Sequence, residues 1–173
     1  ESLSKIKSLS TKKPEEFSKE STNILGEAGV SLVYVPHFSG TGVSGAVRWI
    51  NNIPVIQLSL FGSFADIFWF NLFHEIGHLI LHGKKEKFIE FNDRDLSNVQ
   101  NKEKEADKFA SDELIPEKVY SEFLKKGLSK QGIIYLAQSL SIHPEIVAGR
   151  LCHDKKVKWN KVSSLRRRLK FIQ

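Results

Sequence analysis

The segment FWFNLFHEIGHLILHG, residues 68–83, is the most informative part of the chain. Most of its positions are apolar, which predicts a helix that is buried on nearly every side. The segment also contains histidines and a glutamate, which are costly to bury without partners. Ser63 and Asp66 form a capping-box pattern and Gly83 is a typical C-terminal residue, so we expect one helix between them.

His74 and His78 are four residues apart, and a helix turns about 400° over that distance. Both imidazoles therefore share one face, roughly 6 Å apart along the axis, where they can bind one metal ion. Glu75 is rotated aside, so it is the candidate general base and not a ligand. We expect the ion to be zinc, with manganese as the alternative, because such ligands discriminate poorly between divalent ions.

A catalytic zinc ion usually has a third protein ligand. His82 lies eight residues after His74, which is about 12 Å along a helix, so we expect it to lie outside the ligand set. The acidic helix expected at residues 98–115 is the better source of a third ligand. On its helical wheel Glu103 falls within the apolar face, whereas Glu105 and Asp107 flank that face. Periodicity alone favours Glu103, and a solvated charge run is the alternative for all three.

Three short β-prone runs precede the buried helix, and turn-forming residues separate them. This order predicts a small antiparallel meander with a tight second turn at Asn51 and Asn52. The third run is the candidate edge strand for pairing with an extended substrate. The runs are residues 30–35, 43–50 and 54–60, and residues 87–91 are a candidate for a further strand.

Helical patterns surround these strands, so the predicted fold class is α+β. We expect one compact domain, in which residues 1–127 form the core with the HExxH helix. Residues 128–173 form a helical, basic extension that packs on this core. The expected helices are residues 14–28, 98–115 and 116–126, followed by helical segments from residue 129 with breaks near residues 141–144 and 154–159.

The composition, with 40% hydrophobic residues, fits a soluble globular protein and excludes disordered and collagen-like chains. The single cysteine, Cys152, cannot form an intramolecular disulfide, so we expect a cytoplasmic protein with an inert core thiol. No apolar run reaches the ~20 residues of a membrane span. The chain has no methionine, even at position 1, so we expect it to be part of a longer protein.

The last 24 residues carry most of the positive charge. Residues 150–173 contain nine basic residues and one acidic residue, Asp154. One interpretation is a patch that binds nucleic acid or an acidic partner. The other, which we favour, is a solvated amphipathic helix whose arginines face water. Its inward-facing residues would be Val162, Leu165, Leu169 and Ile172.

Two strings in the chain, FHEIGHLILHG and EKEADKFASDELIP, resemble the ImmA/IrrE family of zinc metallopeptidases. The resemblance implies a zincin-like fold. It also implies that the third zinc ligand is the glutamate before the alanine, which is Glu105, 27 residues after His78. Glu103 remains the alternative for the third zinc ligand. Three further residues are candidates to contact the metal ligands without binding the metal: Asp107, Glu103 and His82. Asp107 would orient His74 or His78 by a hydrogen bond.

Further strings, including VPHFSGTGVSGAVRW and LAQSLSIHPEIVAGRLCHDKKVKW, resemble the C-terminal part of HigA-type antitoxin regulators. These carry an N-terminal helix-turn-helix, through which we expect the main contact with DNA, with weak binding through the basic tail. The resemblance implies a peptidase-like domain of a transcriptional regulator that cleaves a regulator protein. The alternative is a catalytically silent module that binds a toxin or DNA. Candidates for stabilising the substrate carbonyl are Tyr34, His37, Arg48, Tyr120 and Tyr135, each with a structural alternative.

Overall fold

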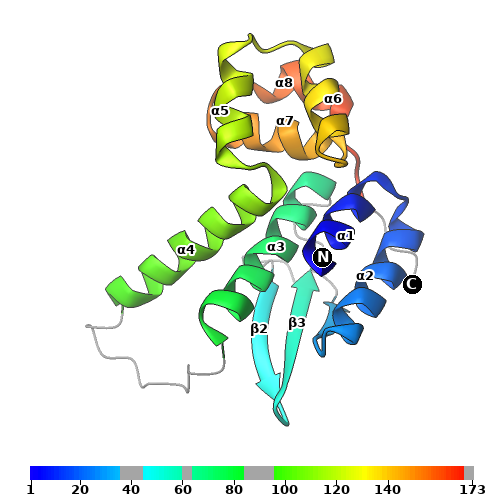
Figure 1. The fold of residues 1–173 in the computed structure, drawn as a ribbon, viewed down its shortest axis with the longest axis vertical. Helices are drawn as coiled ribbons and strands as arrows, with labels where there is room; N and C mark the ends of the chain where they lie inside the picture. Colours follow the sequence, from blue (N-terminus) through cyan, green and yellow to red (C-terminus); the bar gives the residue numbers. More distant parts are fainter. Residues whose placement is uncertain (36–44, 60–63, 84–95, 170–173) are drawn as a thin grey trace.

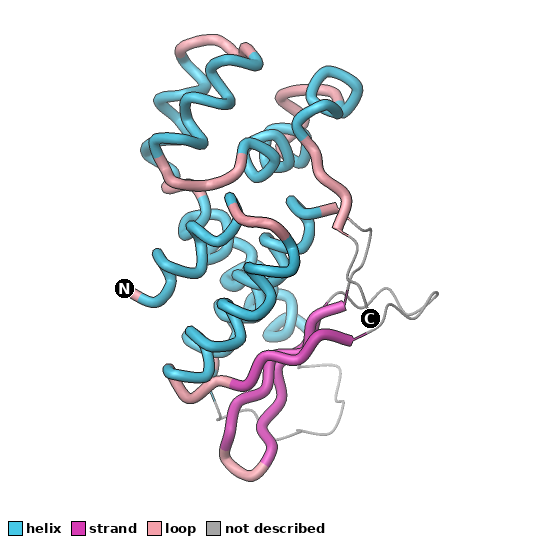
Figure 2. The backbone as a smooth tube through the Cα atoms, turned by 90° about the vertical axis from the view of Figure 1, so that its right-hand side faces the viewer, coloured by secondary structure: helices cyan, strands magenta, loops and turns pink. Residues whose placement is uncertain are grey.

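The computed structural model describes residues 1–35, 45–59, 64–83 and 96–169 (Figure 1). It confirms the α+β class: the described part is mostly helical, with one three-stranded sheet. Figure 2 shows the sheet at one end of the molecule and the helices above it. The division at residue 127 stays a prediction. Among the described helices, none is both long and apolar enough to cross a membrane.

The N-terminal segment forms two α-helices. They are α1 (Ser2–Ser8) and α2 (Pro14–Glu27), joined by a 3-10 turn at Leu9–Thr11. Helix α2 begins at Pro14 as predicted, because proline has a helical φ and its missing N–H is not needed in the first turn. Its Phe17 is fully buried and contacts the ring of Trp69.

The sheet contains β1 (Ser31–Val35), β2 (Gly45–Ile50) and β3 (Ile53–Ser59) in the order β1-β3-β2. Strands β2 and β3 form the predicted antiparallel hairpin, whose turn residues Asn51 and Asn52 have φ angles of 48° and 68°. The predicted meander is wrong for β1, which pairs in parallel with β3. Residue periodicity shows which face of a strand is buried, but it does not identify the neighbouring strand. The candidate strand at residues 87–91 lies outside the described residues.

Helix α3 (Ala65–Leu81) lies at the centre of the molecule and contacts β2, β3 and several other helices, including α2. It begins after Phe64, and nine of its 17 residues are buried. The predicted burial on nearly every side is therefore only partly correct, because Ile80 is 54% and Leu81 48% exposed. Ser63 of the expected capping box lies outside the described residues. Helix α4 (Leu96–Leu114) packs along α3. A Cβ on Gly77 would lie 3.3 Å from Cα of Ala106, so the two helices approach closely where they carry the candidate site.

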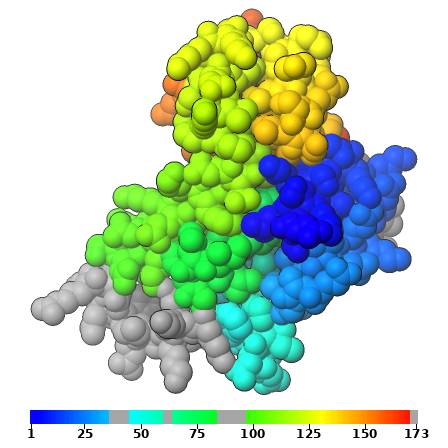
Figure 3. Space-filling model, viewed as in Figure 1, coloured from blue at the N-terminus to red at the C-terminus, as the bar shows by residue number. Residues whose placement is uncertain are grey.

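The C-terminal helices form the upper part of the molecule in Figures 1 and 3. As predicted, Pro116 separates α4 from α5, and breaks precede α7 and α8. Helix α7 packs against both α6 and α3, which joins this part to the central helix. The helices are α5 (Glu117–Lys125), α6 (Lys130–Ser139), α7 (Pro144–His153) and α8 (Trp159–Val162), followed by the 3-10 turn Ser163–Leu165.

Arg166 and Arg167 of the basic C-terminal segment form internal ion pairs, so the prediction that the arginines face water is wrong for these two. The predicted amphipathic helix is also wrong after Leu165, where the described chain is extended and Arg168 forms a β-bridge with Phe64. Arg166 donates two hydrogen bonds, of 3.0 and 2.9 Å, to Asp66 at the start of α3. Arg167 binds the fully buried carboxylate of Glu145 on α7. Buried carboxylates need such partners, and these lie far away in the sequence. The predicted inward-facing Val162, Leu165 and Leu169 are buried, whereas Ile172 lies outside the described residues.

Candidate metal centre

The side chains of His74 and His78, both on α3, point towards the same position next to α4. Nε2 of His74 and Nε2 of His78 are 3.0 Å apart, and the ring centroids are separated by 4.6 Å. This proximity follows from the helix itself, because residues at i and i+4 are neighbours on one face. The structure thus brings together the two imidazoles that the sequence identifies as candidate ligands.

Glu103 of α4 completes the group. Its carboxylate oxygens lie 3.3 Å from Nε2 of His74 and 3.2 Å from Nε2 of His78. Among the described residues, these three side chains form a group whose nitrogen and oxygen atoms all lie within 4.8 Å of one another, as a metal ion requires. Glu103 is the residue that the helical wheel favours, because it belongs to the face of α4 that packs on α3.

Glu105, which the family resemblance indicates as third ligand, lies elsewhere on α4. Its Oε2 is 3.8 Å from Nδ1 of His82. His82 is the residue after the end of α3, and its Nε2 lies 3.4 Å from the carbonyl oxygen of Lys102. The structure therefore places His82 and Glu105 beside each other. His82 lies one helix turn after His78, and Glu105 lies two residues after Glu103.

Asp107 contacts His74 on the side of the ring that faces away from the other two side chains of the group. Its Oδ1 lies 2.9 Å from Nδ1 of His74, the ring nitrogen that faces away from His78. A carboxylate in this position accepts a hydrogen bond from Nδ1–H, and the lone pair of Nε2 then points towards the other two side chains. Asp107 lies one turn after Glu103 on α4, so one helix face provides both carboxylates.

The donor set fits a divalent metal ion. Two imidazole nitrogens and one carboxylate oxygen converge on one point, and the contact with Asp107 leaves the correct nitrogen of His74 available. Burial, and then the neighbouring His74, lower the pKa of His78, so this ring is held in the neutral form that a metal ion requires. His74, His78 and Glu103 are thus able to hold a metal ion.

Glu75 is buried behind the two histidines, between α3 and the sheet. Only 6% of its surface is exposed, and burial, with a smaller effect of the charge on Glu103, raises its pKa to about 7. Gly45, at the start of β2, lies directly against it: a Cβ there would come within 2.5 Å of Oε1 of Glu75. Sequence patterns do not single out Gly45, because its only signal is a glycine at the beginning of a β-prone run.

The sheet edge beside Glu75 differs from the predicted one. Residues 54–60 were expected to form an edge strand, but β3 pairs on both sides and is therefore central. In the described sheet the edge strands are β1 and β2, and β2 is the one that contacts Glu75 through Gly45. An extended peptide that pairs with β2 would therefore lie next to the metal group.

The candidates for stabilising the substrate carbonyl have varied positions. The hydroxyl of Tyr34 lies 2.8 Å from Oγ of Ser21, and the guanidinium of Arg150 stacks on the ring of Tyr120, so both tyrosines have structural contacts. Tyr135 is 73% exposed on α6, and Arg48 belongs to β2. His37 lies outside the described residues. Cys152 is a buried free thiol, as expected.

A comparison with models of protein families finds a match. The family model of the IrrE N-terminal-like domain, peptidase M78, matches residues 66–152. This range contains α3 from its second residue, the whole of α4 and all the side chains of the metal group. No curated protein matches the chain.

Proposed function

The chain belongs to the peptidase M78 family of IrrE N-terminal-like domains, and on this premise we propose that it is a zinc-dependent peptidase. The observation that carries the proposal is the convergence of His74, His78 and Glu103 on one point, with the buried carboxylate of Glu75 beside it. A helix that provides two imidazoles and an adjacent carboxylate is the arrangement of metallopeptidases that activate water.

In this proposal His74, His78 and Glu103 hold the ion. Glu103 is preferred to Glu105 because its oxygens face both Nε2 atoms, whereas the Oε2 of Glu105 is 3.8 Å from His82. Zinc, when bound, lowers the pKa of water to about 7 and polarises the carbonyl of the bond that is cleaved.

The chain's own residues carry out the proton transfers. Glu75 accepts a proton from the attacking water at its carboxylate and returns it to the nitrogen of the leaving amine. Asp107 keeps His74 in the required tautomer through the contact of 2.9 Å with Nδ1. Gly45 leaves space for the carboxylate of Glu75, because any side chain on β2 at that position would occupy it.

Strand β2 provides the position for the substrate. It is an edge strand of the described sheet, and an extended peptide adds to such an edge by main-chain hydrogen bonds. Such a peptide must come from a flexible protein segment. We therefore propose a cytoplasmic regulator protein as the substrate, in agreement with the resemblance to antitoxin regulators.

A second candidate function is a silent regulatory module that binds a toxin or DNA. The observation that favours it is a group of exposed basic residues that remains after the internal arginine pairs are formed. Phosphate contacts through such residues would weaken steeply as the salt concentration rises. The group contains Lys155, Lys156, Lys158, Lys161 and Arg168.

The experiment that separates the two candidates is a cleavage assay with the zinc-loaded chain. The substrates are regulator and toxin proteins encoded beside its gene, and the control is Glu75→Gln. We expect cleavage by the wild type and a loss of about 10²–10⁴-fold in turnover for the variant, with zinc retained. Zinc binding without cleavage of any such protein, together with salt-sensitive DNA binding, would favour the regulatory module.

A further inference from the structure

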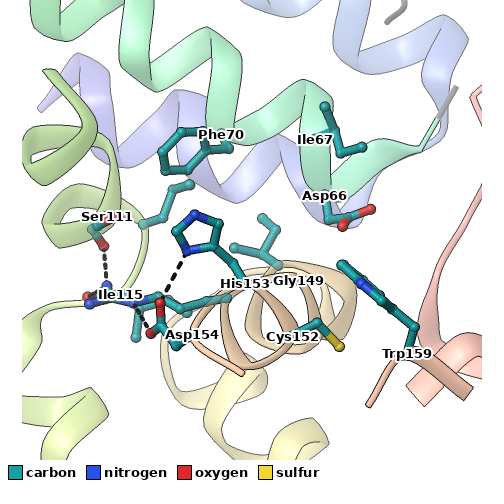
Figure 4. A pocket seen from close by; sticks show the side chains of 13 residues that line it. Asp66, Ile67, Phe70, Ser111, Ile115, Gly149, Cys152, His153, Asp154 and Trp159 are labelled. Atoms are coloured by element: carbon teal, nitrogen blue, oxygen red, sulfur yellow. Dashed lines mark hydrogen bonds and ion pairs between the residues drawn. The ribbon is translucent and has the colours of Figure 1, made fainter. Parts of the chain in front are cut away.

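A cavity of about 380 Å³ lies on the side of α3 that faces α7, separate from the metal group. Figure 4 shows side chains from four helices around it: Asp66, Ile67 and Phe70 from α3, Ser111 from α4, Cys152 from α7 and Trp159 from α8. We propose that this cavity binds an uncharged, largely apolar small molecule and that its occupation strengthens metal binding by the neighbouring site.

The size of the cavity suits a small ligand. A cavity of roughly 150 Å³ is sufficient for benzene, so 380 Å³ has room for a molecule of two fused rings. It also lies within the range of about 300–1,000 Å³ that is typical of ligand pockets. The inner wall is apolar and buried, whereas Trp159 is 44% exposed and forms part of the opening. The buried apolar wall contains Leu114, Ile115 and Ile146.

The charged groups around the cavity already have partners. Asp66 is bound by Arg166 at 2.9 Å, and Asp154 contacts His153 at 3.1 Å. Arg150 donates to Glu117 at 2.8 Å and to the backbone carbonyl oxygens of Ser111 and Ile115. A charged ligand would have to disrupt one of these pairs or lose its own hydration, which is costly in an apolar cavity. An uncharged ligand avoids both costs.

The cavity is connected to the metal group through both helices that carry it. Phe70 lines the cavity, and its ring lies 6.3 Å from the ring of His74, one turn further along α3. Ser111 lines the cavity one turn after Asp107, which contacts His74. A ligand that contacts α3 and α4 in this arrangement stabilises the spacing that brings Glu103 to the histidines.

The test uses 2-naphthol as an uncharged probe and 2-naphthoate as its anionic counterpart, with the full chain in metal-free form. Binding is followed by chemical-shift changes of the backbone amides. We expect saturable binding of 2-naphthol with Kd of about 1 mM or tighter, shifts at Ile67, Leu114 and Gly149, and at least about tenfold weaker binding of 2-naphthoate. Shifts located elsewhere, equal binding of 2-naphthoate, or no saturation would overturn the proposed site.

Two variants of α3 form a matched pair for the same measurement. Ile67→Phe fills the cavity and should weaken 2-naphthol binding about tenfold, whereas Ile80→Phe changes a residue that is 54% exposed and should leave it unchanged. If Ile67→Phe does not fold, the shift map of the wild type decides alone. Equal loss in both variants would contradict the location.

The proposed coupling between the cavity and the metal group rests on the proposed function. It is tested separately, by measuring zinc affinity. Because coupling between two sites is reciprocal, saturating 2-naphthol should raise zinc affinity by about fivefold, and zinc should raise 2-naphthol affinity equally. Binding of 2-naphthol to the metal-free chain does not depend on catalysis, so failure of the peptidase proposal leaves it intact. Binding with no change in zinc affinity would overturn the coupling.

Discussion

Gly45 and Glu75 are in direct contact: the position where a Cβ of Gly45 would lie is 2.5 Å from Oε1 of Glu75. The contact joins the start of the edge strand β2 to the helix that carries both histidines. Glu75 has space for its carboxylate only because residue 45 has no side chain. The strand that would hold the substrate and the candidate base are therefore fixed relative to each other.

Gly45→Ala should displace the carboxylate of Glu75 and lower peptide turnover by about 10²–10⁴-fold, the range expected when a general base is lost. Zinc content should not change, because residue 45 is not one of the candidate ligands. Gly26→Ala is the control, since a Cβ at that position meets nothing within 4 Å. Full turnover by Gly45→Ala would show that Glu75 does not need this space.

Glu103→Gln should weaken zinc binding by more than about 100-fold, because it removes a charged ligand and not merely an outer partner of a ligand. Glu105→Gln, two residues away, is the matched control and should retain nearly full affinity. The measurement is competition for zinc with a chelator of known affinity. A larger loss of zinc affinity in Glu105→Gln than in Glu103→Gln would assign the third ligand to Glu105.

Glu145→Ala should destabilise the fold by about 3–5 kcal/mol, because it leaves Arg167 without the carboxylate that it contacts inside the protein. Glu20→Ala, which breaks the half-exposed pair with Lys12, should cost about 0–1 kcal/mol. Urea denaturation followed by circular dichroism measures both. Similar losses in the two variants would mean that the Arg167 pair contributes no more than a surface pair.

His143 should make stability depend on pH. Burial, and then the charge of Arg167, lower its pKa in the fold to about 4, whereas the unfolded chain has a value of about 6.5. As pH falls from about 6.5 to 4, the unfolded chain binds a proton that the folded protein does not. Stability is therefore lost over this window, by about 1–2 kcal/mol after allowance for the partial exposure of the ring.

His143→Asn keeps an N-cap side chain on α7 but removes this titration, so its stability should change less between pH 6.5 and 4 than that of the wild type. Glu145 also faces His143 and titrates in both proteins, so the difference between them isolates the histidine. His153→Asn is the control because His153 is exposed. Parallel pH profiles for wild type and His143→Asn would contradict the prediction.

The sequence predicts the local parts of the site and misses the long-range ones. His74 and His78 are related by a single helix turn, and their convergence follows from the spacing. The wheel of α4 indicates Glu103, because that residue shares a face with the buried Ala106, whereas the family resemblance indicates Glu105, so the sequence leaves the third ligand open. The contact of Gly45 with Glu75 depends on how a strand packs on a helix, which periodicity does not contain.

The same distinction applies to the rest of the fold. The hairpin of β2 and β3 is predicted because its Asn-Asn turn is local, whereas the parallel partner of β1 is not. Arg166 and Asp66 are separated by 100 positions, and only the folded chain brings them together. Charge counts therefore describe the C-terminal segment as a basic surface, although two of its arginines neutralise buried carboxylates.

Elemental analysis of zinc in the wild type, His78→Ala and Glu75→Gln tests the central assignment most directly. We predict one zinc ion per chain in the wild type and in Glu75→Gln, and almost none in His78→Ala, because an imidazole ligand is lost only in the latter. Stoichiometric zinc in His78→Ala, or no zinc in the wild type, would contradict the assignment of α3 and α4 as a metal centre.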